Sequence, residues 1–214
     1  MKGDMTVLIE QLNSVIFVGE FPPGCLDERD LFGGNVDFNT LHKLPQITQC
    51  SFASGKYQLL LTPDRIDLRA NETTILSNEL VEAARTVARR LDGLQQMTKV
   101  TAVGMNCDGA IVRNDIGKDG EKYCTELVSA DIQHLIGAPE YLTKISVSFP
   151  SPPFFYNIRL EPHAKSQGDH LFVAVNGHQT LTNLEPLASK FQRVEEFRLY
   201  VKEFHRLIRS NTKR

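Results

Sequence analysis

The chain has 214 residues, of which 41% are hydrophobic and 23% are charged, the composition of an ordinary globular protein. Its 24 Lys and Arg against 26 Asp and Glu give a formal charge of −2, which excludes a globally basic nucleic-acid binder. No run approaches the ~18 apolar residues of a membrane span, and four widely spaced cysteines without a C-x-x-C pair indicate free thiols in a reducing cytosol. We therefore expect a cytoplasmic protein with no membrane partner.

The first part of the chain is expected to form β-strands joined by tight turns. Val15–Phe21 is an apolar, β-branched run that ends at Pro22-Pro23-Gly24, so it predicts a strand and its end. Residues 24–44 have the composition of a loop with room for one short helical turn. Three further runs are separated by turn residues and predict a three-stranded meander: Gln46–Ala53, Lys56–Thr62 and Ile66–Arg69.

A helix is predicted after this meander, beginning at Ser77 or Asn78 and ending at Gly93. Its apolar residues recur at intervals of three and four, the pattern of a helix with one buried face: Leu80, Ala84, Val87, Leu91 and Leu94. Two runs separated by Asp108-Gly109 then predict a hairpin: Lys99–Asn106 and Ala110–Asn114. Cys107 would be the most exposed thiol of the chain in that turn.

The second half repeats this order of elements. Ile145–Phe149 and Phe154–Leu160 alternate apolar with polar residues and predict two strands around a proline-rich turn. Asn176-Gly177 is the strongest hairpin signal in the chain and separates two strand-like runs: His170–Val175 and His178–Thr182. A final helix is predicted from about Pro186 to about Ser210, with a stripe of apolar residues: Phe191, Val194, Phe197, Val201, Phe204 and Ile208.

This pattern predicts an α+β fold with a mostly antiparallel sheet, built from two meander-then-helix blocks whose helices pack on one face. The blocks would be residues 1–120 and 121–214, either as two units or as one continuous domain. Strands that follow one another without intervening helices argue against a doubly wound parallel sheet.

Common catalytic motifs are missing from the sequence. It contains no G-x-x-x-x-G-K-[ST] phosphate loop, no G-x-G-x-x-G, no H-E-x-x-H and no G-x-S-x-G. Active sites also assemble from scattered residues, so catalysis is not excluded, but a non-catalytic function is favoured and no cofactor is expected.

Residues 115–126 resemble a calcium-binding loop at four positions. Asp115 is first, Asp119 fifth, Gly120 sixth and Glu126 twelfth in a twelve-residue loop. Gly117 removes a ligand at the third position, and the eighth, Lys122, stands where such loops pack an apolar residue. A polar strand-to-helix loop is therefore the favoured interpretation.

Three histidines and a carboxylate suggest a second metal site. His163, Asp169, His170 and His178 lie within 16 residues, and the last two flank the predicted Asn-Gly hairpin. Paired strands can bring such residues together, and imidazoles with a carboxylate bind zinc or another transition metal. The favoured alternative is that these side chains lie in a loop and at exposed strand ends.

The final helix carries a basic ridge, which consists of Arg198, Lys202, Arg206, Arg209 and Lys213. Their spacing of three and four residues places them on one helix face. Such a ridge suits a nucleic-acid backbone. The alternative is a solvated face whose cations favour the negative end of the helix dipole.

One segment of the chain resembles a known layout. Tyr57–Leu68 contains Leu61-Thr62-Pro63-Asp64-Arg65-Ile66, and it is followed by the predicted helix and by Val100–Asn106. This arrangement resembles a sporadically distributed family of uncharacterised bacterial proteins that carry a similar hairpin, helix and strand. The resemblance covers about a quarter of the chain, and it implies no activity and no catalytic residues.

Together these observations favour a cytosolic, non-catalytic module for protein–protein interaction, with a protein partner or a second copy of itself as a homo-oligomer. The first alternative is a nucleic-acid-associated module that uses the basic ridge. The second is a metal-dependent enzyme around the segment from His163 to His178.

Overall fold

The computed structural model describes residues 13–22, 26–32, 36–44, 46–70, 77–94, 97–111, 113, 117–127, 144–162, 164, 169–181, 186–190 and 193–210. The strands are β1 (Ser14–Glu20), β2 (Phe38–Leu44), β3 (Ile47–Phe52), β4 (Tyr57–Thr62), β5 (Arg65–Ala70), β6 (Lys99–Ile111), β7 (Ile145–Ser151), β8 (Phe154–Pro162) and β9 (Leu171–Thr180). The helices are α1 (Glu28–Phe32), α2 (Ser77–Gly93), α4 (Gly120–Glu126), α6 (Leu187–Lys190) and α7 (Val194–Ser210). No helix within these ranges is both long and apolar enough to cross a bilayer.

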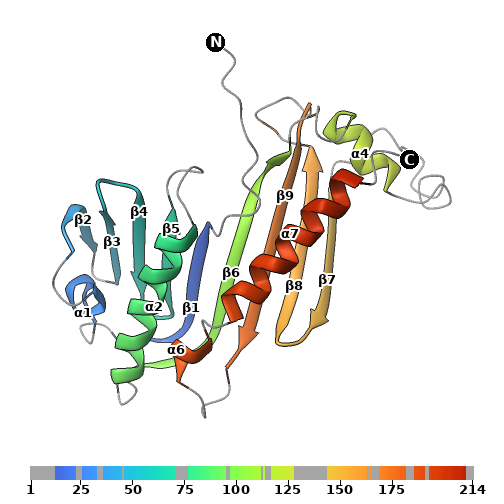
Figure 1. Ribbon diagram of the computed structural model, residues 1–214. Coiled ribbons are helices and arrows are strands. Elements are labelled where there is room, and N and C mark those ends of the chain that lie inside the picture. Colours follow the sequence, from blue (N-terminus) through green and yellow to red (C-terminus); the bar gives the residue numbers. More distant parts are fainter. Residues whose placement is uncertain are drawn as a thin grey trace.

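The described strands form one nine-stranded sheet in the order β2-β3-β4-β5-β1-β6-β9-β8-β7, and the strand pairs for which a register is given are all antiparallel (Figure 1). Each half has the same order along the chain: a leading strand, a meander and a long helix. The leading strand pairs with the last strand of its own meander, β1 with β5 and β6 with β9. The two leading strands pair with each other and so join the halves into one sheet. The predicted α+β class is thereby confirmed, whereas the boundary at residue 120 stays a prediction.

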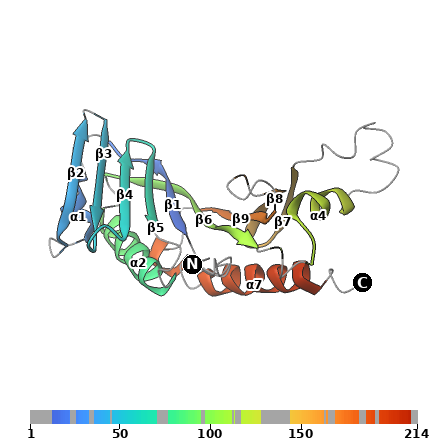
Figure 2. The same ribbon diagram turned by 90° about the horizontal axis from the view of Figure 1, so that it is seen from above.

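The long helices α2 and α7 lie on the same side of the sheet (Figure 2). Their predicted apolar stripes face the sheet because burial of these side chains removes apolar surface from water. In α2, Leu80, Ala84, Val87 and Leu91 are buried, and in α7 Val194, Phe197, Val201 and Ile208 are buried. The core therefore lies between the helices and the inner face of the sheet.

The two hairpins predicted around Asp108-Gly109 and Asn176-Gly177 are wrong. Each segment is a single strand, and the two strands, β6 and β9, pair over ten residues from Ala102 to Ile111. Gly177 is needed for packing instead of a turn, since an added Cβ would lie 2.7 Å from a ring carbon of Phe197. The long-range pairing and burial thus outweigh the local turn preference.

Three further differences from the sequence predictions concern the ends of the sheet and a thiol. Residues 24–44 contain β2 as well as the short helix α1, because an edge strand needs little apolar alternation. Residues 120–126 form α4, capped by Asp119, whose side chain accepts a hydrogen bond from the backbone N–H of Lys122. Cys107, expected to be exposed, is 1% exposed because it faces the core from β6.

Candidate binding face

The face of the sheet turned away from α2 and α7, here called the outer face, carries polar residues where the inner face carries the core. Strand alternation places on it Ser14, Ile16, Arg65, Asp67, Arg69, Gly104, Asn106, Asp108, Phe155, Asn157, Arg159, Glu161, Asn176 and His178. One set of directly paired residues crosses eight strands and is polar throughout. This polar row consists of Ser51, Gln58, Arg69, Ser14, Asn106, Asn176, Asn157 and Ser148.

Hydrogen bonds between neighbouring strands fix the centre of the polar row. The Asn106 amide donates to Ser14 Oγ over 2.8 Å, and the Asn176 amide donates in turn to Asn106 Oδ1. Asn106 and Asn176 remain partly accessible, and Asn157 beside them is exposed. The row therefore presents amide groups whose orientation is set within the protein while part of their surface faces solvent.

Next to the row, a buried carboxylate holds two arginines. Asp67 Oδ2 accepts hydrogen bonds from Arg65 Nη2 at 2.7 Å and from Arg69 Nε at 2.9 Å. The Asp67 side chain is 0% exposed, whereas those of Arg65 and Arg69 are 38% and 56% exposed. The hydrogen bond to Asp67 raises the pKa of Arg69. The carboxylate thus positions two partly exposed guanidinium groups, although Arg65 Nε is buried without a hydrogen-bond partner among the described residues.

Asp108 is the second acid of this face, and it is partly buried. Burial raises the pKa of its carboxyl, while the hydrogen bond from Asn13 and the charges of Arg159 and Arg69 oppose that rise. The Asn13 amide donates to Asp108 Oδ1 over 3.0 Å and to its backbone carbonyl over 2.7 Å. Arg69 therefore lies between two acids, Asp67 and Asp108, and its charge opposes the rise in the pKa of the Asp108 carboxyl.

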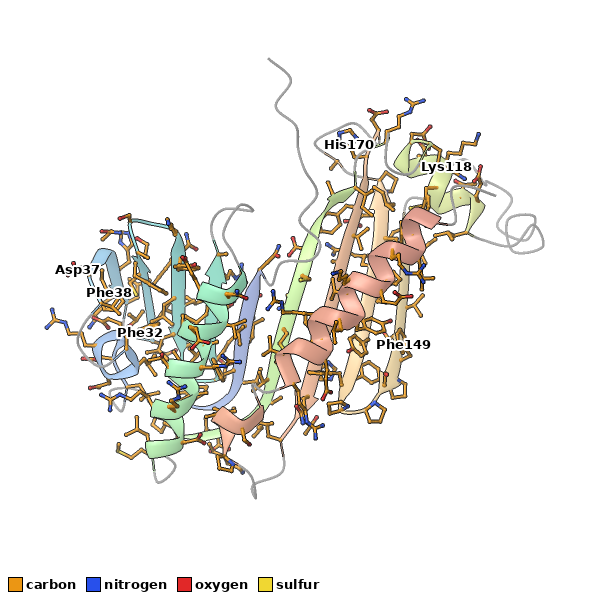
Figure 3. The ribbon with its side chains drawn as sticks, viewed as in Figure 1. Phe32, Asp37, Phe38, Lys118, Phe149 and His170 are labelled. Carbon is orange, nitrogen blue, oxygen red and sulfur yellow. The ribbon has the colours of Figure 1, made fainter. Side chains whose placement is uncertain are left out.

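We expect Asp108→Asn to be more stable than the wild type at pH 7, with an advantage that shrinks as the pH falls towards about 4. A raised pKa in the folded state means that the wild type takes up its proton on folding and gains stability as the pH falls through that pKa. The asparagine cannot titrate, and its Oδ1 can still accept from Asn13. Thermal unfolding across this pH range, with the exposed Asp37→Asn (Figure 3) as control, measures the effect. A difference that stays constant with pH would contradict it.

The row of paired residues next to the polar row contains a buried glycine, Gly104. Asp67, Ile16, Gly104 and His178 are directly paired across four strands, and Phe155 follows on β8. Phe155 is 39% exposed, and its ring lies 5.2 Å from that of His178. A Cβ added at Gly104 would meet only Ile16 Cβ at 3.8 Å and Asn176 Nδ2 at 3.9 Å within 4 Å. A methyl group would therefore fit there in ordinary van der Waals contact, although its neighbours bury Gly104 itself.

The described members of the predicted histidine cluster do not converge. His170 and His178 stand at opposite ends of a continuous strand, about 26 Å apart along β9, because the hairpin that would have joined them does not exist. Asp169 lies near His170 and forms an ion pair with Arg113 at 2.9 Å. His163 lies outside the described residues. Within the described ranges, no three His, Cys, Asp or Glu side chains form a group that could hold a metal.

The calcium-loop candidates have other partners. Asp119 caps α4, and Glu126 forms ion pairs with Lys118 and Lys122. Asp115 lies outside the described residues. Figure 3 shows Lys118 and His170 near the same end of the molecule, where α4 packs against β8 and β9.

The basic ridge on α7 is partly engaged by neighbouring groups. Arg198 donates to Asn78 Oδ1 at the start of α2 over 3.0 Å. Arg206 donates two hydrogen bonds to Glu203, at 2.6 and 2.8 Å, and Lys202 is exposed. The side chain of Arg209 and all of Lys213 lie outside what the structure describes. Two of the five predicted cations therefore have polar partners within the chain.

The described thiols and the small surface hollows do not add a reactive group to the outer face. Burial raises the pKa of the Cys50 and Cys124 thiols to about 12, and it raises that of Cys107 as well. Two small hollows lie near Phe21, Leu44 and Ile47, and between Asp30, Arg89 and Met97. Neither hollow reaches the polar row.

Sequence reasoning did not identify the outer face as a site. The sequence does contain a pattern that indicates this face, namely polar residues at alternate positions of β6, β8 and β9, such as Asn106, Asn157 and Asn176. The two wrong hairpins concealed it, because they placed Asn176 and Asp108 in turns.

No protein-family model matches this sequence, and no curated protein matches it. The resemblance to a family of uncharacterised bacterial proteins stays a prediction. The function is therefore inferred from the chemistry of the outer face.

Proposed function

We propose that the chain is a non-catalytic protein-binding module of the cytosol and that its outer face takes the partner. The observation that carries the proposal is the polar row, which runs over eight strands on the face opposite the long helices. At about 4.8 Å per strand the row is about 34 Å long, a length that suits a protein–protein interface of standard size.

The balance of charges on the outer face favours a protein partner over a nucleic-acid partner. Arg65, Arg69 and Arg159 are matched by Asp67, Asp108 and Glu161, three cations against three acids. Binding to a phosphate backbone depends on an excess of cations, whereas amides and balanced charges suit the mixed polar surface of a protein. On α7, the contacts of Arg198 and Arg206 within the chain also lower the charge available to a phosphate backbone.

Three observations favour binding over catalysis. Asp67 is held by two arginines, and Asp108 by Asn13 with Arg69 and Arg159 nearby. Burial makes the three described thiols poor nucleophiles by raising the pKa of each. Of the described histidines, His178 on the outer face lies against the ring of Phe155.

A photo-crosslinking amino acid at Asn157, on the outer face, tests the proposal against one at Lys202, on α7. We expect irradiation in living cells to give a discrete protein adduct from position 157 and none from position 202, because both positions are exposed and only one lies on the proposed interface. The adduct must then be reproduced with the purified partner. Adducts from position 202 alone, a nuclease-sensitive adduct, or none from either position would refute the proposal.

Self-association is the second candidate, and the edge strand β7 favours it. β7 pairs only with β8 among the described strands, and an open edge can pair with another chain. Val147 on this strand is 51% exposed, and Leu199 and Leu207 of α7 are 66% and 45% exposed. Light scattering at the mass of a dimer, lost on Val147→Glu, would support this candidate.

A further inference from the structure

We infer that a hollow between two helices binds a small organic anion, in which a phosphate or carboxylate group carries a short apolar chain. The hollow lies where α1 packs against α2, near the end of α2 (Figure 1). It is lined by Asp30, Arg89, Arg90, Gly93, Leu94 and Met97. These residues lie outside the outer face, so the site goes beyond the proposed function.

The hollow has the size of a small-molecule site. Its volume is about 310 Å³, at the lower end of the range of about 300–1,000 Å³ that is typical of ligand pockets. The other hollow, near Phe21 and Ile47, measures about 80 Å³ and is lined by no charged side chain. Of these two hollows, the one beside α1 therefore combines room for a ligand with charged groups that could hold it.

Two arginines give the hollow an excess of positive charge. Arg90 Nε donates to the backbone carbonyl of Asp30 over 3.0 Å, so a neutral group holds this guanidinium towards α1. Arg89 has no hydrogen-bond or ion-pair partner among the described residues. By contrast, Arg85 lies one turn earlier in α2 and forms an ion pair with Glu82. Within the described part of the chain, no ion pair neutralises Arg89 or Arg90.

The acidic groups near the hollow are engaged elsewhere. Asp27 Oδ1 accepts from the backbone N–H of Asp30 over 2.7 Å, and Asp30 Oδ2 accepts from that of Asp27 over 3.4 Å. Both carboxylates thereby cap the first turn of α1. The Asp92 carboxylate accepts from the backbone N–H groups of Leu187 and Ala188 and so holds α6. The end of α2 adds only about half a negative charge, so two guanidinium charges still exceed the negative charge beside them.

A methionine and a leucine supply the apolar wall of the hollow. Met97 is 49% exposed, and Leu94 packs against the core with part of its surface accessible. The flexible, polarizable side chain of methionine adapts to apolar groups of different shapes. Guanidinium groups bind phosphate and carboxylate oxygens through paired hydrogen bonds. An anion with a short apolar chain would use both parts of the site, its oxygens on the arginines and its chain on Met97.

Isothermal titration calorimetry on the purified full chain tests this site with three probes: hexyl phosphate, inorganic phosphate and hexanol. We expect hexyl phosphate to bind at least about tenfold more tightly than inorganic phosphate, because burial of only two methylene groups corresponds to about that factor. Hexanol lacks the charged group and should give no measurable binding.

Three variants assign the binding to named side chains. Arg89→Gln should bind hexyl phosphate about tenfold or more weakly, because charge-assisted hydrogen bonds are lost. Arg85→Gln removes the same charge from α2 outside the hollow and should bind as the wild type. Met97→Ser should bind hexyl phosphate little better than inorganic phosphate, with the affinity for inorganic phosphate unchanged. Arg89 and Met97 are exposed, so both variants should keep the midpoint of thermal unfolding of the wild type.

A lack of binding of hexyl phosphate at millimolar concentration would overturn the inference. Equal losses in Arg85→Gln and Arg89→Gln would overturn it too, because they would show a diffuse attraction between charges instead of a site. Hexanol that binds as tightly as hexyl phosphate would replace the anion by a purely apolar ligand.

Vesicles of phosphatidylcholine, with and without phosphatidic acid, distinguish two sources of the same chemistry. Sedimentation with the vesicles that requires both phosphatidic acid and Arg89 would support the site with a lipid headgroup as its ligand. Binding of hexyl phosphate without such sedimentation would support it with a free small molecule. The crosslink at Asn157 is measured independently, so failure of this site would leave the proposed function intact.

Discussion

Replacing Phe197 by alanine is expected to lower the free energy of unfolding by about 3–5 kcal/mol. Phe197 is 0% exposed and is the largest buried side chain of α7. Its ring lies 6.1 Å from that of Phe154 and 6.2 Å from that of Tyr156, nearly parallel to the latter. It also fills the space above Gly177 that a side chain there would take. Alanine would leave a cavity whose walls, a backbone and two rings, can collapse only partly.

Urea denaturation followed by circular dichroism measures this effect, with Leu199→Ala as the matched control. Leu199 lies on the same helix and is 66% exposed, so its truncation should change stability by no more than about 0.5 kcal/mol. A loss below about 1 kcal/mol for Phe197→Ala would mean that α7 does not form a single core with β8 and β9.

The second large effect is expected at Gly19, where the two halves of the sheet meet. Gly19→Ala should cost about 1–3 kcal/mol, because its Cβ would overlap the Lys99 carbonyl oxygen and lie 2.9 Å from the carbonyl carbon. The pairing of β1 with β6 shifts register between Val18 and Gly19, and this local bulge brings the two backbones too close for a side chain. Both atoms belong to the backbone, so neither can move without disturbing the junction.

Gly104→Ala is the control for Gly19→Ala, since both glycines lie in the two central strands. Its Cβ would have no neighbour closer than 3.8 Å, and alanine costs less chain entropy than glycine, so stability should be unchanged or higher. Chemical denaturation of the two variants gives the comparison. Equal destabilisation by both changes would show that the loss comes from glycine replacement in a strand and not from the contact with Lys99.

The strands of the meander were predictable because their local signals agree with their tertiary environment. Lys56–Thr62 alternates apolar with polar residues, and the structure buries Tyr57, Leu59 and Leu61 of β4. The turn over residues 53–55 is also real, with positive φ at Ala53, Ser54 and Gly55. The helices α2 and α7 were predictable from the period of their apolar residues. Each of these signals spans a few neighbouring residues and needs no knowledge of the partner strand.

Asn176-Gly177 shows where that reasoning fails. The dipeptide has the intrinsic preference of a hairpin turn, yet it lies in the middle of β9, paired with Asn106 and Met105. The glycine admits the ring of Phe197, which lies twenty positions further along the chain. Because that neighbour is distant in sequence, the residue pair alone cannot distinguish a turn from a close packing contact.

By itself the sequence determined the class of the fold, the extent of α2 and the strands of the first meander, since these depend on apolar periodicity and turn chemistry within short segments. It also predicted the end of α7 at Ser210, but the predicted start at Pro186 was wrong, because the structure has a separate short helix, α6 (Leu187–Lys190), and α7 begins at Val194. Tertiary structure alone decided that β1 pairs with β6, that β6 and β9 are continuous strands, and which polar side chains share the outer face. Register is a relation between segments far apart in the chain, and a shift of one residue exchanges the two faces of a strand. For that reason Ser14, Asn106 and Asn176 could not be recognised as one row until their strands were paired.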